Sequence, residues 1–185
     1  ALGKLQNEED PKLKALFEKA LDDKFWLIRM LGIEQGEVNE RTATRIEKLA
    51  ESDPHSTVRE SALNKLAETS DKKYAPLAVR AIEKDPAMKV VSAGLDALLV
   101  LDKDAALATA KKLETEEDEG IILALASIYA ETGDPAHLPF FEQKFDKVGG
   151  YMQITFIEQY VQLASNADPA TMIQVAEKLK QVAVN

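Results

Sequence analysis

The sequence predicts an all-α superhelix of stacked helical hairpins, and three observations lead to this fold class. Apolar residues recur every three or four positions along most of the chain, which is the spacing of one face of an α-helix. Proline follows aspartate five times, and this pair typically begins a helix. Aspartates also recur at an interval of about 30 residues, which is typical of helical repeat proteins.

The Asp-Pro pairs occur at positions 10–11, 53–54, 85–86, 134–135 and 168–169. An aspartate oxygen can accept a hydrogen bond from the first turn of a helix, and proline at the first helical position loses no hydrogen bond. We therefore expect each pair to start a helix. Five such starts in 185 residues predict many short helices.

A repeated column pattern locates the inner helices of the hairpins. The pattern is aligned on five aspartates, Asp23, Asp53, Asp85, Asp118 and Asp146. Successive aspartates are 30, 32, 33 and 28 residues apart. Large apolar residues stand five positions after them, at Ile28, Val58, Val90, Leu123 and Tyr151. Small residues stand nine positions after them, at Gly32, Ala62, Gly94, Ser127 and Thr155. This pattern predicts inner helices beginning near 24, 54, 86, 119 and 149, in a single repeat domain spanning 1–185.

Outer helices are expected between the inner ones, where apolar residues again follow one another by three or four positions. Leu13, Leu16, Phe17 and Ala20 are one example. The apolar run 121–126 also permits a buried strand, but its alanine content and its register with the other repeats favour a helix.

The composition limits the classes of partner. Apolar residues make up 45% of the chain and charged residues 30%, as in folded proteins with a core. The formal net charge of −9 disfavours nucleic acids and anionic membranes, because both need a basic surface on the protein. No segment approaches the length of a transmembrane helix. We expect a soluble protein that is cytoplasmic, periplasmic or secreted, and the absence of cysteine is compatible with cytoplasm or periplasm.

No residue pattern predicts catalysis or a metal site in this chain. His55 and His137 have no histidine, cysteine or pair of carboxylates three or four residues away that would complete a metal site, so we interpret them as loop residues at helix starts. An EF-hand loop beginning at Glu114 would need glycine at its sixth position and glutamate at its twelfth, where this sequence has Glu119 and Leu125. We therefore expect the acidic run Glu114–Gly120 to be a solvated loop that caps the next helix. Nucleophile elbows, phosphate loops and zinc-protease motifs are also absent from the sequence. We therefore expect no catalytic residue, cofactor or metal here.

Four residues near the start of the repeats are candidates for an interface. Phe25 and Trp26 begin the first inner helix, where they either pack between repeats or anchor a preceding domain or partner. Arg29 and Arg59 each stand six positions after a column aspartate. They either pair with an acidic residue of the same or the next repeat, or bind an external carboxylate. Val91 and Ala124 interrupt this arginine column.

The segments Asp53–Leu63 and Asp85–Val91 resemble the inner-helix signature of HEAT-like repeats, and the resemblance covers nearly the whole chain. It implies a right-handed α-α solenoid of about five hairpins, related in architecture to armadillo repeats. The segment Asp23–Arg29, with its Phe-Trp pair and its arginine, further resembles the region that follows the catalytic domain in bacterial aminopeptidase N-like zinc metallopeptidases.

The second resemblance implies a non-catalytic C-terminal domain that packs on the upstream catalytic domain and bounds substrate access. Zinc is then expected only in that upstream domain, because the substrate and zinc motifs of the family have no counterpart here. The chain begins at Ala1 without methionine and with a polar segment, which we interpret as excision from a longer polypeptide. Two alternatives stay open: a free-standing scaffold that binds a protein partner, and a repeat-containing lyase.

Overall fold

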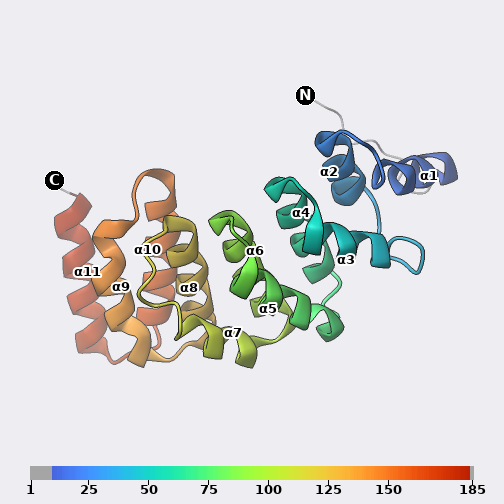
Figure 1. Ribbon diagram of the computed structural model, residues 1–185. Helices are drawn as coiled ribbons and strands as arrows, with labels where there is room; N and C mark the ends of the chain where they lie inside the picture. The colour runs from blue at the N-terminus through green and yellow to red at the C-terminus, as the bar shows by residue number, and fades with distance from the viewer. Residues whose placement is uncertain (1–9, 184–185) are drawn as a thin grey trace. The chain divides into compact units, whose positions relative to one another are not determined.

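The computed structural model describes residues 10–183, and the chain divides into two compact units, residues 1–101 and 102–185 (Figure 1). The prediction of a single repeat domain stays a prediction. Residues 1–9, to which the expectation of an excised amino terminus refers, lie outside the described residues.

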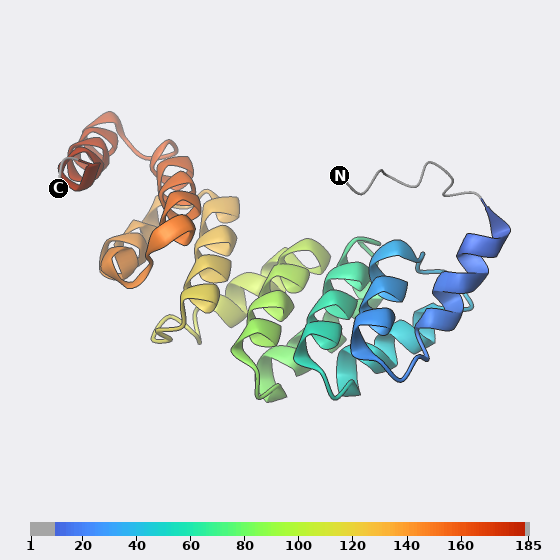
Figure 2. The ribbon, with the colours of Figure 1, turned by 90° about the horizontal axis from the view of Figure 1, so that it is seen from above.

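Unit 1 contains six α-helices within the described residues, together with the short 3-10 helix η1. They are α1 (Pro11–Ala20), α2 (Trp26–Gln35), α3 (Ala43–Ser52), α4 (Ser56–Ala67), η1 (Lys72–Tyr74), α5 (Ala75–Lys84) and α6 (Met88–Leu101). Consecutive helices pack in pairs, α1 on α2, α3 on α4 and α5 on α6. The second helices of the pairs also pack on one another, and Figure 2 shows α2, α4 and α6 side by side in that order.

Unit 2 also consists of helices and connecting loops within its described residues. Its elements are α7 (Lys103–Ala110), α8 (Glu119–Thr132), η2 (Pro135–His137), α9 (Leu138–Lys144), η3 (Phe145–Lys147), α10 (Gly150–Ala164) and α11 (Pro169–Ala183). Helix α8 packs on α7, α9 and α10, and α10 packs on α9 and α11. Phe141, Phe156 and Tyr160 fill the core of this unit, and the rings of Phe141 and Tyr160 stack with centroids 5.2 Å apart.

The all-α class is confirmed, since no strand occurs between residues 10 and 183. The apolar run 121–126 lies inside α8, as a buried helix. The helices at the expected inner positions begin at Trp26, Ser56, Met88, Glu119 and Gly150. No helix of the described part of the chain is both long and apolar enough to cross a membrane.

The Asp-Pro pairs start helices in two different ways. Asp10 caps α1 directly, and Pro11 is its first residue. At Asp53-Pro54 and Asp85-Pro86, in contrast, the helix begins two residues after the proline, so the expected start was wrong there. Each of these two aspartates still accepts a hydrogen bond from the backbone N–H two positions on, which turns the chain into the helix. Its carboxylate is shared with an arginine of the preceding hairpin.

The column of small residues marks the closest approach of paired helices. A Cβ atom added at Gly32 would lie 2.9 Å from both the Ala20 Cβ and the Phe17 backbone oxygen of α1. At Gly94 it would lie 2.9 Å from Ile82 Cγ1 of α5. The expectation that a small residue admits the neighbouring helix is confirmed at both positions.

Candidate functional site

Arg29 of α2 joins the first hairpin to the second. Its Nε and Nη2 groups donate to the two carboxylate oxygens of Asp53 at 2.6 and 2.8 Å. Its Nη1 group donates to the backbone oxygen of Asp23 at 2.8 Å. The arginine thus holds both the turn before its own helix and the turn before the next inner helix, α4.

Arg59 of α4 repeats this arrangement one hairpin further along unit 1. Its Nε and Nη2 groups donate to Asp85 at 2.6 and 2.7 Å, and its Nη1 group donates to the backbone oxygen of Asp53 at 2.7 Å. Arg59 is buried. The pairing of Arg29 and Arg59 with acidic residues of the next repeat is therefore confirmed, and both forked donor groups are already occupied.

The two aspartates raise the pKa values of the arginines that they bind. Hydrogen bonding to Asp53 raises the pKa of Arg29, and hydrogen bonding to Asp85 raises the pKa of Arg59. Burial raises the pKa of Asp85, but the hydrogen bonds from Arg59 and from the Ala87 N–H, together with the Arg59 charge, outweigh it. The pKa of Asp85 therefore lies below its ordinary value, and the pair stays ionised at neutral pH.

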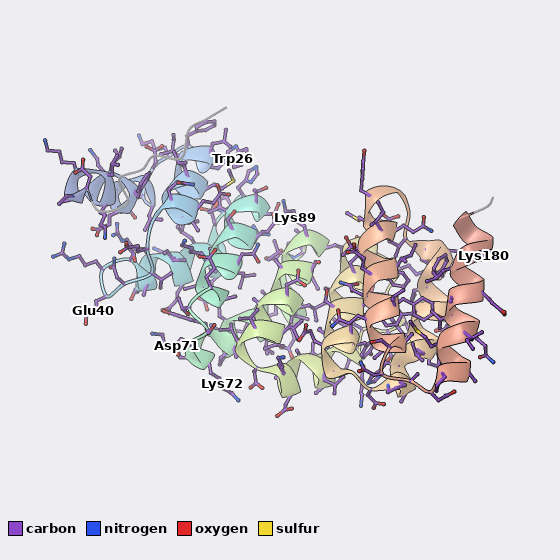
Figure 3. All side chains as sticks on the ribbon, turned by 180° about the vertical axis from the view of Figure 1, so that it is seen from behind. Trp26, Glu40, Asp71, Lys72, Lys89 and Lys180 are labelled. Atoms are coloured by element: carbon purple, nitrogen blue, oxygen red, sulfur yellow. The ribbon has the colours of Figure 1, made fainter. Side chains whose placement is uncertain are left out.

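Trp26 lies in the first turn of α2 (Figure 3) and stacks on His55. The two rings are nearly parallel, with centroids 3.8 Å apart and an interplanar angle of 4°. His55 is the N-cap residue of α4, so this contact joins two successive hairpins. The packing between repeats that the sequence suggested for Trp26 is present, and Trp26 remains partly exposed.

Phe25 is more exposed than Trp26, with 53% of its surface accessible. Its backbone N–H donates to Asp23 Oδ1 at 2.8 Å, which fixes the turn, while its ring meets Trp26 edge to face. Leu27, Ile28 and Leu31 of α2 are also exposed. We call Phe25, Leu27, Ile28 and Leu31 the α2 end face.

A hollow of about 600 Å³ opens beside the Trp26–His55 stack. We call it the first hollow. It is lined by the α1–α2 turn, by the start of α2, by one side of α3 and by the Asp53–His55 turn. Its charged lining residues are Asp22, Lys24, Arg29, Arg45, Lys48 and Asp53.

The two histidines lie at helix starts, as expected, but each also stacks on an aromatic ring. His137 lies 4.1 Å from the ring of Tyr129 in unit 2. Within residues 10–183 no three His, Asp or Glu side chains cluster closely enough to hold a metal ion. We therefore assign no metal chemistry to the described residues.

The acidic run is held by several contacts of unit 2. Asp118 caps α8 by accepting from the Gly120 and Ile121 N–H groups, so the expected capping role is confirmed. Glu114 accepts from the hydroxyl of Tyr129, and the buried Lys144 donates to the backbone oxygen of Glu116 at 2.7 Å. Burial and the Glu114 carboxylate raise the pKa of Tyr129. Residues 114–119 are nevertheless exposed, so the run is the solvated loop that the sequence predicted, tied to unit 2 by these contacts.

Sequence reasoning did not find most of the residues around the first hollow. The structure brings Trp26 and Arg29 together with Lys24, Arg45 and His55, whereas Arg59 lies at the equivalent place in the next hairpin. One feature of the sequence could have indicated that Phe25 and His55 have equivalent places in successive repeats. Each stands two positions after a column aspartate. No spacing rule connects Arg45 to this group, since it comes from an outer helix.

Comparison with known proteins adds no family to this description. No family model matches the chain, and no curated protein matches it either.

Proposed function

We propose that this chain is the non-catalytic C-terminal helical-repeat domain of a zinc aminopeptidase, a right-handed solenoid of HEAT-like hairpins that packs on the catalytic domain and bounds substrate access. The observation that carries the proposal is the α2 end face, an exposed apolar surface at the first hairpin. Contiguous apolar patches of this kind mark protein interaction sites.

The repeat pattern explains why this face is apolar. Ile28, Val58 and Val90 occupy equivalent positions, five residues after their column aspartates. Val58 and Val90 are 0% exposed, whereas Ile28 is 38% exposed. Helix α4 packs on both α2 and α6, while α2 packs on α1 and α4. Ile28 therefore carries a large apolar side chain, as buried positions of the stack do. No helix of the described residues covers it as the equivalent valines are covered.

The location of the face favours a partner that precedes this chain in the same polypeptide. A tethered domain would meet the first hairpin at a high effective concentration, so a small apolar face would suffice for stable docking. The segment Asp23–Arg29, which carries the resemblance to zinc aminopeptidases, also supplies Phe25, Leu27 and Ile28 of the face. Motif and exposed surface thus coincide, which supports the peptidase parent.

The zinc chemistry of such a parent would belong to its catalytic domain. The residues described here offer no ligand cluster, so no step of a hydrolytic reaction is assigned to them. Their part in catalysis would be steric, through limiting which peptides reach the active site.

The first experiment is to read the open frame upstream of the codon for Ala1. A His-Glu-x-x-His motif in frame, followed by a further glutamate ligand, is the expected result. A start codon directly before Ala1 would overturn the peptidase parent. The free-standing scaffold would then be the better account, with the α2 end face binding a separate protein.

The docking surface can be tested with the separately expressed upstream domain. Leu27→Asp combined with Leu31→Asp places two charges on the α2 end face, and we expect at least a tenfold loss of affinity by calorimetry. Met88→Asp is the matched control, because Met88 is a similarly exposed apolar residue at the first turn of α6. Equal affinities for all three proteins would exclude the α2 end face as the docking surface.

Substrate access needs its own measurement. We expect removal of the repeat domain to change the ratio of cleavage rates for long and short peptides. An identical length preference with and without the domain would contradict the steric role.

A further inference from the structure

We infer that the first hollow binds an acidic peptide segment of the protein on which this chain docks. This inference rests on the proposed docking function and adds a second, chemically different contact beside the α2 end face. It follows from the charge, the aromatic lining and the comparison with an equivalent hollow one hairpin away.

The first hollow is basic in a chain that is acidic as a whole. Its lining contains four cations, Lys24, Arg29, Arg45 and Lys48, and only two carboxylates, those of Asp22 and Asp53. The whole chain, in contrast, has 32 acidic and 23 basic residues. A local reversal of charge on an acidic protein is the kind of feature that selects an acidic ligand.

Both carboxylates in the hollow are already paired with arginine. Asp53 accepts the two hydrogen bonds from Arg29, and Asp22 Oδ2 lies 3.0 Å from Nη1 of Arg45. Lys24 and Lys48 are exposed, and neither makes an ion pair within residues 10–183. The two lysines therefore supply the uncompensated positive charge of the hollow.

The arginines hold the rest of the site in place. Arg29 fixes the Asp53 turn, which carries His55 to its position against Trp26. Arg45 donates to the backbone oxygen of Glu18 at 2.7 Å and so ties α3 to the end of α1. The stacked rings of Trp26 and His55 are a rigid aromatic part of the lining, suited to contact with an aromatic or aliphatic side chain.

The next hairpin provides an internal comparison. A second hollow of about 440 Å³ occupies the equivalent place between α3, α4 and α5. Its lining has three cations, Arg59, Arg80 and Lys84, and three carboxylates, and it contains no aromatic residue. The fold itself therefore does not require a basic or aromatic hollow at this place.

A short acidic peptide fits these features better than other anions. Nucleic acid would meet the repulsion of a chain with a net charge of −9, and that repulsion acts along the whole polyanion. A peptide of a few residues meets only the local field, and its backbone and side chains can cover the ring surface. We expect the bound segment to carry acidic residues on both sides of an aromatic residue, so that carboxylates reach Lys24 and Lys48.

Trp26 makes the inference directly measurable, because it is the only tryptophan of the chain and lines the hollow. The probe is a blocked synthetic peptide of sequence Glu-Asp-Phe-Glu-Asp, titrated into the full chain at low salt while tryptophan fluorescence is recorded. We expect a saturable change that weakens as salt is added. The same peptide with Gln and Asn in place of Glu and Asp should give no saturation.

Two variants decide whether the hollow is the binding site. Lys24→Glu combined with Lys48→Glu should weaken binding of the acidic peptide at least tenfold. Lys84→Glu, in the second hollow, changes the net charge in the same direction and should change binding less than twofold. Equal binding of acidic and amide peptides, or an equal loss in the Lys84→Glu variant, would overturn the inference.

The peptide-binding test and the docking test can fail separately. Leu27→Asp with Leu31→Asp should leave peptide binding unchanged, since neither residue lines the hollow. A chain that binds the peptide but no upstream domain would refute the docking proposal and leave the peptide site in place. A chain that docks on the domain but ignores the peptide would refute only the peptide site.

Discussion

Arg59 and Asp85 form a two-pronged ion pair across the boundary between the second and third hairpins, with donor–acceptor distances of 2.6 and 2.7 Å. The Arg59 side chain is 11% exposed and the Asp85 side chain is 8% exposed. The same guanidinium also satisfies the backbone oxygen of Asp53. One side chain of α4 thus connects the turn before its own helix to the turn before α6.

Replacing Arg59 by Ala should lower the free energy of unfolding by roughly 3–5 kcal/mol, because it leaves the buried Asp85 carboxylate without its cation. Urea denaturation followed by circular dichroism measures this change. Arg80→Ala is the control, since Arg80 pairs with Glu51 in an exposed ion pair, which typically contributes about 0–1 kcal/mol. Similar losses in both variants would show that burial of the Arg59 pair has no special effect.

Stability should fall in acid partly through Asp85. The folded-state pKa of this carboxyl lies below the ordinary 3.8. Its contribution is therefore fully present well above the ordinary pKa and is lost as the pH falls through the lower folded-state pKa. We expect the stability difference between wild type and Asp85→Asn to shrink as the pH is lowered toward that range.

The matched control for this pH dependence is an uncharged core change. Leu95→Ala alters no titratable group, so its deficit relative to wild type should stay nearly constant over the same pH range. A deficit of Asp85→Asn that is equally constant would contradict the lowered pKa.

Gly32→Ala should destabilise unit 1 by about 1–3 kcal/mol, although alanine is the better helix former. The added methyl would meet the Phe17 backbone oxygen and the Ala20 Cβ, each at 2.9 Å, and neither is the end of a flexible side chain. Thermal unfolding measures the effect. Ala62→Gly at the equivalent position of α4 should cost only about 0.5–1 kcal/mol, through backbone entropy and a lost methyl group. A stabilised Gly32→Ala protein would show that α1 and α2 can move apart at no cost.

Leu95→Ala should cost about 2–5 kcal/mol, because Leu95 is 0% exposed in the core of unit 1 and its truncation leaves a cavity. Val100→Ala on the same helix is the control. Val100 is 55% exposed, so its replacement should change the stability by no more than about 0.5 kcal/mol. Denaturant midpoints of both variants test this contrast.

Much of the helical architecture could be predicted from the sequence, for local reasons. Apolar residues spaced by three and four positions predict which face of each helix is buried. The small residues Gly32, Ala62 and Gly94 predict where paired helices approach most closely. The pairing of Arg29 and Arg59 with acidic residues of the next repeat was also predictable, because a repeated column implies a repeated contact. The helices at Asp53-Pro54 and Asp85-Pro86 begin two residues later than expected, because each aspartate accepts from the backbone N–H two positions on and the helix begins only after that turn.

The sequence by itself thus determined the helices, their period and the acidic overall charge of this chain. Only the tertiary structure decided that His55 lies against Trp26, that Lys24 and Lys48 face one hollow, and that Ile28 is uncovered while Val58 is buried. The physical reason is that periodicity describes which side of one helix is apolar, whereas a site is made by side chains from several helices. Which helix covers which face depends on packing between hairpins, and that information is not contained in any single segment.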